Sequence, residues 1–229
     1  MQISIIIPTQ NEYSNIVRLL GFFEKALHHE ISEIIVVDSG SSSDSVNLID
    51  GRFKYIKTHV TSRASQMNEG AKFSIGNVLV FLHADVTPPP TFESDILSAL
   101  DAGNEFGFFA YNFDPSSIWL DINASFTDKK GLFVGGGDQI HFIKRSVFDT
   151  LGGYDENMVV MEDFEFFKRI IINKIPYTIL QNRARVSSRK YIKNSWLKVN
   201  FANLIAFIMF KLNFDSKTIK KYYTKLLNK

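Results

Sequence analysis

The stretch Val78-Leu79-Val80-Phe81-Leu82, followed at once by His83-Ala84-Asp85, indicates the fold of this chain. Five consecutive apolar residues are too few for a helix of their own, and they are typical of a strand covered on both faces in a parallel sheet. A charged side chain is costly inside such a layer, so Asp85 is expected where the strand leaves the sheet. Ligands of α/β folds bind at the carboxyl edge of the sheet, and we therefore expect a functional site at Asp85.

A second strand repeats this pattern. Glu33–Val37 reads as another buried strand and is also followed by an acid, Asp38. The first strand, Ile3–Ile7, is followed by Pro8-Thr9-Gln10-Asn11. Two parallel strands that deliver carboxylates to one edge suggest a site for a divalent cation, a sugar hydroxyl or a base edge. The alternative is that each aspartate only caps the helix that follows it.

Composition restricts the function. The 229 residues are 45% hydrophobic and 14% aromatic, which is ample for the core of one sizeable α/β domain. The net charge is only +2, so the chain as a whole gives no signal for nucleic-acid binding. The absence of cysteine excludes a disulfide framework, a thiolate zinc site and a cysteine nucleophile. The sequence begins with a strand and not with a basic segment before an apolar one, so we expect no secretory signal and a cytoplasmic location.

Strands and helices alternate over roughly the first hundred residues, which predicts a parallel sheet with right-handed crossovers. Helices are expected near 45–49, over 63–73 and before Gly103, and short strands at 55–58, 107–113 and 139–143. A further helix is predicted over 162–172, with Phe164, Phe167 and Ile171 on one face. The buried stripe of the first helix is predicted to be Ile16, Leu19, Leu20, Phe23 and Leu27.

Several short motifs match a known pattern in their order and spacing. They are Pro8-Thr9-Gln10-Asn11-Glu12, Asp38-Ser39-Gly40-Ser41-Ser42-Ser43-Asp44, His83-Ala84-Asp85, Gly152-Gly153-Tyr154 and Met161-Glu162-Asp163. Together they resemble family 2 glycosyltransferases of the GT-A fold over nearly the whole chain. Arg63–Ala71 and Gly137-Asp138-Gln139 narrow the resemblance to a bacterial transferase 2 subgroup associated with radical-SAM and selenium-related gene neighbourhoods. The resemblance implies an α/β fold with a mixed, mainly parallel sheet flanked by helices and a C-terminal helical extension.

The resemblance also implies a donor side for a nucleotide sugar. Asp85 would hold a divalent cation, Mn²⁺ or Mg²⁺, because a hard cation bound by few carboxylates and by phosphate oxygens neutralises a leaving diphosphate. His83 stands where the family usually has the first acid of Asp-x-Asp, so it would contact the ribose or a water on the metal, or only pack at the strand end. The other residues implied on this side are Asp38 for the nucleobase, Pro8, Thr9 and Asn11 for the base and ribose pocket, Glu12 for the ribose or base, and Arg63 and Arg189 for the diphosphate.

The acceptor side of the resemblance centres on Asp163, which matches the family's base. Inverting transfer needs a group that takes the proton of the acceptor hydroxyl, and a helix start favours an ionised carboxylate. Gly137, Asp138 and Glu162 are implied on the same side, and the glycines at 135–137 would let the backbone approach a sugar closely. Without the family pattern, Glu162-Asp163 reads as an ordinary acidic helix cap.

The C-terminal segment is first apolar and then basic. Residues 199–210 are too few to span a bilayer, which takes about 20 mostly apolar residues. Residues 211–229 include six lysines and one acid, Asp215. This arrangement suits an anchor at a membrane surface. A helix packed over the acceptor site, or against a dimer partner, is an equal alternative.

These observations predict a metal-dependent, inverting glycosyltransferase that moves a sugar from a nucleotide diphosphate sugar, chiefly a UDP-sugar, to a hydroxyl acceptor that is lipid-linked or part of a cell-envelope glycan. Residues 1–194 would form the catalytic domain, with a donor half at 1–102 and an acceptor half at 103–194, and residues 195–229 a C-terminal extension. The expected partners are the nucleotide-sugar donor, the acceptor and the inner face of a membrane. Nucleic acid is not expected as a partner. The alternatives are a nucleotidyltransferase, whose usual glycine-rich N-terminal loop is absent here, and a non-catalytic nucleotide-sugar-binding protein.

Overall fold

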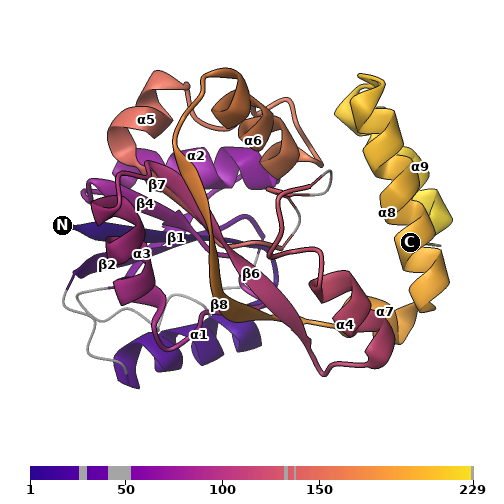
Figure 1. Cartoon of the computed structure of the whole chain (residues 1–229), viewed down its shortest axis with the longest axis horizontal. Helices are drawn as coiled ribbons and strands as arrows, with labels where there is room; N and C mark the ends of the chain where they lie inside the picture. Colours follow the sequence, from indigo (N-terminus) through magenta and orange to yellow (C-terminus); the bar gives the residue numbers. More distant parts are fainter. Residues whose placement is uncertain (26–29, 41–52, 132–133, 137, 228–229) are drawn as a thin grey trace.

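The computed structural model describes residues 1–25, 30–40, 53–131, 134–136 and 138–227 (Figure 1). The strands in these residues are β1 (Ile3–Thr9), β2 (Ile31–Asp38), β3 (Phe53–Lys57), β4 (Val78–Phe81), β5 (Val86–Thr87), β6 (Phe106–Asp114), β7 (His141–Lys144) and β8 (Tyr177–Ser187). They form one sheet in the order β3-β2-β1-β4-β7-β6-β8-β5. The first four strands of this order are parallel, β6 and β8 are parallel to each other, and β7 and β5 pair antiparallel with their neighbours. The predicted mixed, mainly parallel sheet is confirmed.

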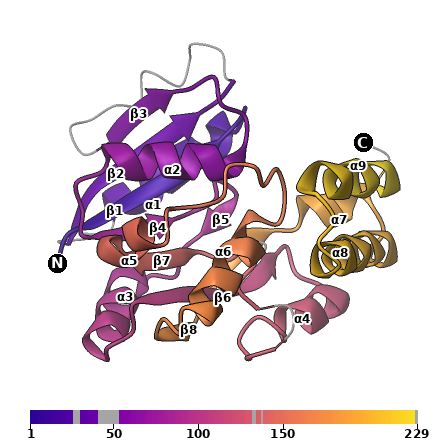
Figure 2. The ribbon, with the colours of Figure 1, turned by 90° about the horizontal axis from the view of Figure 1, so that it is seen from above.

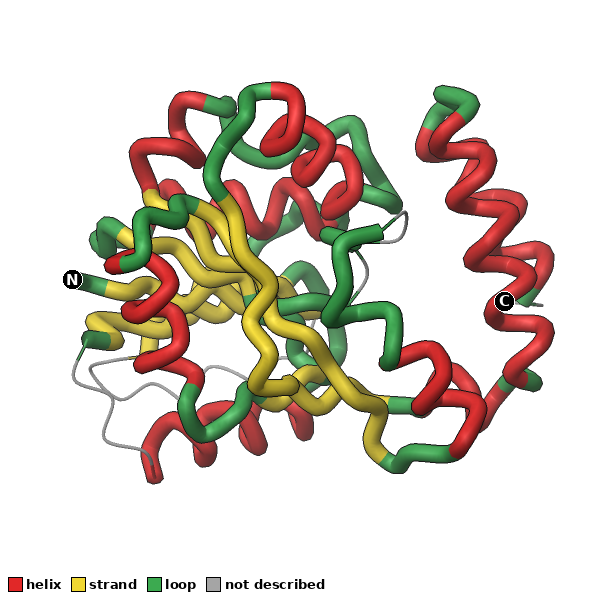
Figure 3. Tube along the Cα trace, viewed as in Figure 1, coloured by secondary structure: helices red, strands yellow, loops and turns green. Residues whose placement is uncertain are grey.

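Helices cover both faces of this sheet (Figures 1 and 3). They are α1 (Tyr13–Lys25), α2 (Arg63–Phe73), α3 (Phe92–Asp101), α4 (Ile118–Ala124), α5 (Arg145–Thr150), α6 (Glu162–Ile172), α7 (Arg189–Lys193), α8 (Trp196–Lys211) and α9 (Ser216–Leu226). Residues of α1 and α3 share one hydrophobic core with the sheet. Residues of α2, α5 and α6 share a second core on the opposite face. The sheet is therefore the middle layer of three, as expected for a sheet with helical crossovers.

The N-terminal half follows the sequence pattern closely. Every residue of β1 and β4 is buried, as expected for central strands covered on both faces. The predicted stripe of α1 is buried at its first four positions, and Leu27 lies outside the described residues. β3 begins at Phe53, earlier than predicted, and the helix predicted at 45–49 also lies outside the described residues.

Helix α2 lies unusually close to the sheet because of Gly70. A Cβ atom at this position would lie 2.4 Å from Cγ2 of Ile6 and 3.1 Å from Cγ2 of Val37. The helix begins where the Ser62 side chain accepts a hydrogen bond from the amide of Ser65 at 3.1 Å, a typical N-cap. This close contact holds α2 against β1 and β2, and the cap at Ser62 sets the start of the helix at Arg63.

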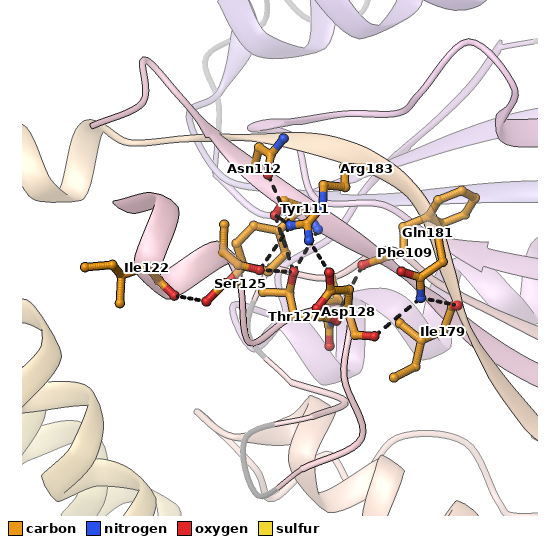
Figure 4. A network of polar contacts seen from close by, with 12 residues as sticks. Phe109, Tyr111, Asn112, Ile122, Ser125, Thr127, Asp128, Ile179, Gln181 and Arg183 are labelled. Carbon is orange, nitrogen blue, oxygen red and sulfur yellow. Dashed lines mark hydrogen bonds and ion pairs between the residues drawn. The ribbon is translucent and has the colours of Figure 1, made fainter. Parts of the chain in front are cut away.

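Strand β8 was not predicted from the sequence, because polar residues interrupt its apolar pattern. One of them, Arg183, donates hydrogen bonds to the carbonyl oxygens of Tyr111 at 3.1 Å and Ala124 at 3.0 Å, and it forms an ion pair with Asp128 (Figure 4). These contacts tie β8 to β6 and to the end of α4. The polar contacts of Arg183 thus hold β8 in the sheet at a position where apolar contacts are usual in other strands.

Helix α6 has the predicted bounds but buries a different face. The predicted stripe is only partly correct: Phe167 packs against the core, whereas Ile171 is 47% exposed and Phe164 packs on α8. Phe166 and Ile170 are fully buried instead. This rotation turns the two acids of the first turn into the protein.

The bulky residues of the predicted stripe have other contacts. Phe164 packs against Phe207 of α8 with ring centroids 5.3 Å apart. A Cβ atom at Gly136 would lie 2.3 Å from the Phe164 ring, and one at Gly135 would lie 2.2 Å from the Phe167 ring. Gly135 and Gly136 therefore make room for α6, and the expected close approach of this backbone to a sugar stays a prediction. Gly137 lies outside the described residues.

Helices α7, α8 and α9 lie to one side of the sheet (Figure 2). α8 packs on α9 through a small core that includes Val199, Ala202 and Leu227. α8 is joined to α4 by two tryptophans, because the indole Nε1 of Trp196 donates to the carbonyl oxygen of Trp119 at 3.0 Å. Across the described residues, every helix is too short or too polar to traverse a bilayer.

Candidate functional site

The carboxyl ends of β1 and β2 form the first wall of the site. Thr9 and Asp38 are paired in register at these ends. The Gln66 side chain of α2 donates to the carbonyl oxygens of Thr9 at 2.7 Å and Val37 at 2.9 Å, which fixes both strand ends to the helix. The hydroxyls of Thr9 and Ser39 are buried without a hydrogen-bond partner among the described residues. Buried polar atoms are normally paired, so two unpaired hydroxyls at this edge are typical of a place for a polar ligand.

Asp38 itself is held by its own neighbourhood. The Tyr55 hydroxyl donates to one of its carboxylate oxygens at 2.7 Å, and the amide of Gly40 donates to the other at 3.3 Å. Pro8 is buried in β1 next to this pair, and Asn11 follows with a positive φ of 57°. Left-handed backbone of this kind is tolerated best by Asn after Gly, and it turns the chain from β1 toward α1.

Arg189 bridges two acids from distant parts of the chain. Its guanidinium donates to both carboxylate oxygens of Glu12, at 2.6 and 2.8 Å, and to Asp85 at 3.3 Å. The predicted donor-side residues at the end of β1, after β4 and at the start of α7 are therefore brought together. A bidentate arginine–carboxylate pair is among the stronger polar contacts in proteins, so Arg189 links the residues after β1 firmly to the start of α7.

The two acids respond differently to their surroundings. Burial opposes ionisation of Glu12, but hydrogen bonds from Arg189 and Asn15 outweigh it and lower its pKa. Burial raises the pKa of Asp85, and the negative charge of Asp138 raises it further, against the lowering effect of Arg189 and Arg63. Asp85 and Asp138 thus repel each other across the site, and a cation between them would relieve this repulsion.

Asp138 faces several cations. Burial opposes its ionisation, but the charges of Lys190, His83, Arg63 and Arg189 outweigh this effect and lower its pKa. His83 is buried at the end of β4, and its charge acts on Asp138. This environment keeps Asp138 ionised, so its role is that of a fixed negative charge.

Glu162 and Asp163 reach the site from the first turn of α6. Both are 4% exposed, and Arg63 donates to Glu162 at 3.1 Å. Burial alone would lower the pKa of Arg63, but the charges of Glu162, Asp163, Asp138 and Asp85 raise it. All four acids therefore act on the pKa of Arg63. We call Asp85, Asp138, Glu162 and Asp163 the acidic cluster.

Asp163 is the acid whose protonation is most strongly affected. Burial raises its pKa well above the usual range, Glu162 and Asp138 raise it further, and Arg63 lowers it. The expectation that the helix start would favour the ionised carboxylate is wrong in its net direction, because burial and the adjacent acid outweigh the dipole. A carboxyl group with a raised pKa is a better proton acceptor once ionised, which suits a general base.

The backbone before α6 supports this placement. Met161 has a φ of 65° and is the residue that precedes the helix. A non-glycine residue in the left-handed region costs free energy, and such residues are found where a surrounding structure demands them. Here the turn leads directly into the two buried acids.

The site has the donor atoms for a cation that arrives with a phosphorylated ligand. Among the described residues, no group of three or more His, Asp or Glu is placed to hold a metal ion. Asp85 offers one carboxylate close to the charge of Asp138. Mg²⁺ is commonly bound through one or two carboxylates plus substrate phosphates. The residues fit such a shared cation and do not fit an all-protein metal cage.

Three residues at the site were not among those predicted. Gln66 holds the ends of β1 and β2, and Lys190 is the cation with the largest effect on the pKa of Asp138. Tyr111 is partly buried, and burial and the charge of Asp138 raise its pKa. Lys190 follows Arg189 directly, so the basic pair was a usable signal. Gln66 and Tyr111 carry no charge, and their sequence context gave no signal for a role in the site.

Sequence comparison identifies the family. The model named Glycosyl transferase family 2 matches residues 4–154. The chain belongs to this family. A Pyrococcus furiosus protein named dolichol-phosphate mannosyltransferase is 30% identical over 111 residues, which cover 46% of this chain and 32% of that protein. The aligned part is therefore about a third of the relative's length.

Solved structures with the family's fold resemble the whole chain. A Pyrobaculum calidifontis mannosyltransferase, PcManGT, in complex with GDP-Man and Mn²⁺, matches with a TM-score of 0.70 at 16% identity over 98% of this chain and 69% of that one. S. aureus TarS 1-349 in complex with UDP matches with a TM-score of 0.67 at 14% identity over 100% of this chain and 71% of that one. At these identities the matches establish the fold, and they confirm the GT-A architecture.

Proposed function

We propose that this protein transfers a sugar from a nucleotide diphosphate sugar to a hydroxyl acceptor, with inversion at the anomeric carbon. The observation that carries this proposal is the acidic cluster, which meets Arg63 and Arg189 at the carboxyl edge of the sheet in a member of glycosyl transferase family 2. Cations suit a leaving diphosphate, and a buried carboxyl group suits removal of a proton from the acceptor.

On the donor side, Asp38 accepts a hydrogen bond from the nucleobase, and Pro8, Thr9 and Asn11 surround the base and ribose, with Glu12 as a further partner. The unpaired hydroxyl of Thr9 supports this assignment. Arg63 and Arg189 lie along the diphosphate, and Asp85 would hold Mn²⁺ or Mg²⁺ there. His83 contacts the ribose or a water on that cation, and its charge also lowers the pKa of Asp138. When bound, the cation neutralises the negative charge that develops on the leaving group. We propose uridine as the nucleoside; of the similar solved structures, one contains GDP-Man and another UDP.

On the acceptor side, the Asp163 carboxylate takes the proton of the acceptor hydroxyl. The acceptor oxygen then bonds to the anomeric carbon from the side opposite the diphosphate, and the bond from that carbon to the diphosphate oxygen breaks. Its electron pair leaves with the nucleoside diphosphate, whose charge the two arginines stabilise. Glu162 holds Arg63 in place, and Asp138 contributes to the acceptor side. The assignment of Gly137 to the acceptor rests on its sequence motif alone.

In this proposal, residues 1–102 bind the donor, residues 103–194 bind the acceptor and residues 195–229 form an extension. The motifs Arg63–Ala71 and Gly137-Asp138-Gln139 support a narrower relationship to the bacterial transferase 2 subgroup. The acceptor class is a lipid-linked or cell-envelope hydroxyl.

A thermal-shift screen tests the proposal directly. UDP, GDP, UDP-sugars and GDP-mannose are compared with Mn²⁺ and with EDTA, since a ligand at about 100 times its dissociation constant stabilises the fold by about 2.7 kcal/mol. The expected result is stabilisation by one nucleoside diphosphate, increased by Mn²⁺, and release of that diphosphate from its sugar on incubation. Release of pyrophosphate from a nucleoside triphosphate with a sugar phosphate would indicate a nucleotidyltransferase instead. Binding of a donor that stays intact with every acceptor would indicate a binding protein.

A further inference from the structure

The bridge that Arg189 makes between two acids engages three side chains to which the proposed function gives ligands. The guanidinium donates to Glu12 at 2.6 and 2.8 Å and to Asp85 at 3.3 Å. In the proposed function the diphosphate lies beside Arg189, the divalent cation lies at Asp85 and the ribose or base lies at Glu12. These three ligands cannot all bind while the bridge is intact, so we asked what the bridge does.

The backbone beside Arg189 is fixed, and its side chain is not. The amide of Ser187 donates to the carbonyl oxygen of Asp85 at 3.1 Å, and the amide of Ser188 donates to that of Asp114 at 3.1 Å. The Arg189 side chain is 48% exposed, so its charge can stay hydrated while the long side chain changes rotamer. Arg189 can therefore change its partners while the start of α7 stays in place.

Each contact of the bridge competes with one part of a cation–diphosphate complex. A divalent cation at Asp85 would lie next to the guanidinium, and like charges at such close range repel each other even in water. A diphosphate would compete with Glu12 for the guanidinium, because arginine binds phosphate and carboxylate groups through the same bidentate geometry. A diphosphate that arrives with its cation relieves both conflicts, since it draws Arg189 from both acids and leaves Asp85 to the cation.

We propose that Arg189 is an internal counter-ion that is exchanged for the complex of a divalent cation with the nucleoside diphosphate. The guanidinium moves to the diphosphate, the cation takes its place at Asp85, and Glu12 accepts hydrogen bonds from the ribose hydroxyls. Asn15, which donates to Glu12 at 2.5 Å, holds that carboxylate in position. The site then binds the cation and the nucleotide together and the free cation only weakly. The identity of the complex rests on the proposed function, whereas the weak binding of the free cation follows from the contacts of Arg189 alone.

Binding of Mn²⁺ to the full chain, followed by electron paramagnetic resonance without nucleotide or sugar, tests the exchange. Arg189→Gln removes the competing charge, so this variant should bind free Mn²⁺ at least ~10-fold more tightly than the wild type. Arg189→Lys keeps the charge and should bind free Mn²⁺ weakly again. The gain should disappear when Asp85→Ala is combined with Arg189→Gln. The matched control is Lys193→Gln, which removes an exposed lysine from the same helix and should bind Mn²⁺ as the wild type does.

The same titrations with UDP give the second measurement. UDP should increase the affinity for Mn²⁺ by a larger factor in the wild type than in Arg189→Gln, because only in the wild type does the diphosphate also draw a positive charge away from Asp85. Equal affinity of the wild type and Arg189→Gln for free Mn²⁺ would overturn the proposal, even if the wild type transfers sugar. A gain that persists in the double variant with Asp85→Ala would overturn it as well. A gain in Arg189→Gln without any effect of UDP would support the counter-ion role and contradict the proposed nucleotide donor.

Discussion

Replacing Arg63 by glutamine is expected to raise the pKa of Asp163. In the native protein the positive charge of Arg63 lowers this pKa, while burial and the charge of Glu162 raise it. The substitution removes the positive charge that lowers this pKa, and the same guanidinium is the donor to Glu162 at 3.1 Å. Both effects act in the same direction, because they leave more uncompensated negative charge beside Asp163.

The size of the effect follows from the exposure of Arg63. An opposite charge within about 4–6 Å moves a carboxyl pKa by about 1–3 units. The Arg63 side chain is 48% exposed, so solvent screens its charge and the lower end applies. We therefore expect the pKa of Asp163 to rise by less than it would beside a fully buried arginine. At a pH below both pKa values, the ionised fraction of Asp163 then falls.

Carbon-13 NMR titration of the carboxyl groups measures this pKa without any substrate. The signal of Asp163 is assigned by its loss in Asp163→Asn, and Arg18→Gln, which removes an exposed arginine from α1, is the matched charge control. The acidic limb of the pH profile for sugar release should move to higher pH by the same amount in Arg63→Gln. An Asp163 titration that is unchanged or moves to lower pH in Arg63→Gln would refute the electrostatic account of the cluster.

Three further predictions concern other parts of the chain. Asp163→Asn should retain donor binding and lose about 10²-fold or more of the transfer rate. The raised pKa of Asp163 favours its protonated form in the fold, so the stability of the wild type falls as pH rises through that pKa. The variant should therefore melt at a higher temperature than the wild type at alkaline pH, and at the same temperature as the wild type near pH ~4. Asp85→Ala should give equal UDP affinity with Mn²⁺ and with EDTA in calorimetry. Gly70→Ala should destabilise the fold by about 1–3 kcal/mol in urea, because its Cβ would lie 2.4 Å from Ile6.

Each of these has a result that contradicts it. Near wild-type turnover in Asp163→Asn would move the base to another residue, with Asp138 as the next candidate. A dependence on Mn²⁺ that survives in Asp85→Ala would place the cation elsewhere. Gly21→Ala is the control for Gly70, since nothing lies within 4 Å of its added Cβ atom, and equal stability of the two alanine variants would disprove the tight contact of α2 with the sheet.

The sequence predicted the elements whose burial is simple. The strand at Val78 is apolar throughout, and α2 carries its small residues on one side, so period and composition agree with the tertiary structure. β8 has no such signal, because Arg183 is satisfied by contacts with residues far away in sequence. Long-range hydrogen bonds of this kind decide burial without leaving a periodic pattern.

The candidate site was predicted in its residue types and not in its packing. Motif order was enough to select Asp85, Asp163 and Arg189, and the structure brings Arg189 to Asp85. The rotation of α6 could not be deduced, because its most regular apolar stripe is shared between the sheet and α8. The raised pKa of Asp163 depends on that rotation, so its direction was also inaccessible from the sequence.

The first turn of α6 contacts both the acidic cluster and helix α8. Asp163 belongs to the acidic cluster, and the next residue, Phe164, packs against Phe207 and Phe210 of α8. A ligand that shifts this turn would therefore change the packing of Phe164 on the inner side of α8. Thermodynamic linkage makes such an effect reciprocal: the factor by which a partner of α8 alters donor affinity equals the factor by which the donor alters affinity for that partner. Phe164 is thus the residue whose replacement would show whether binding at the acidic cluster and binding at α8 are linked.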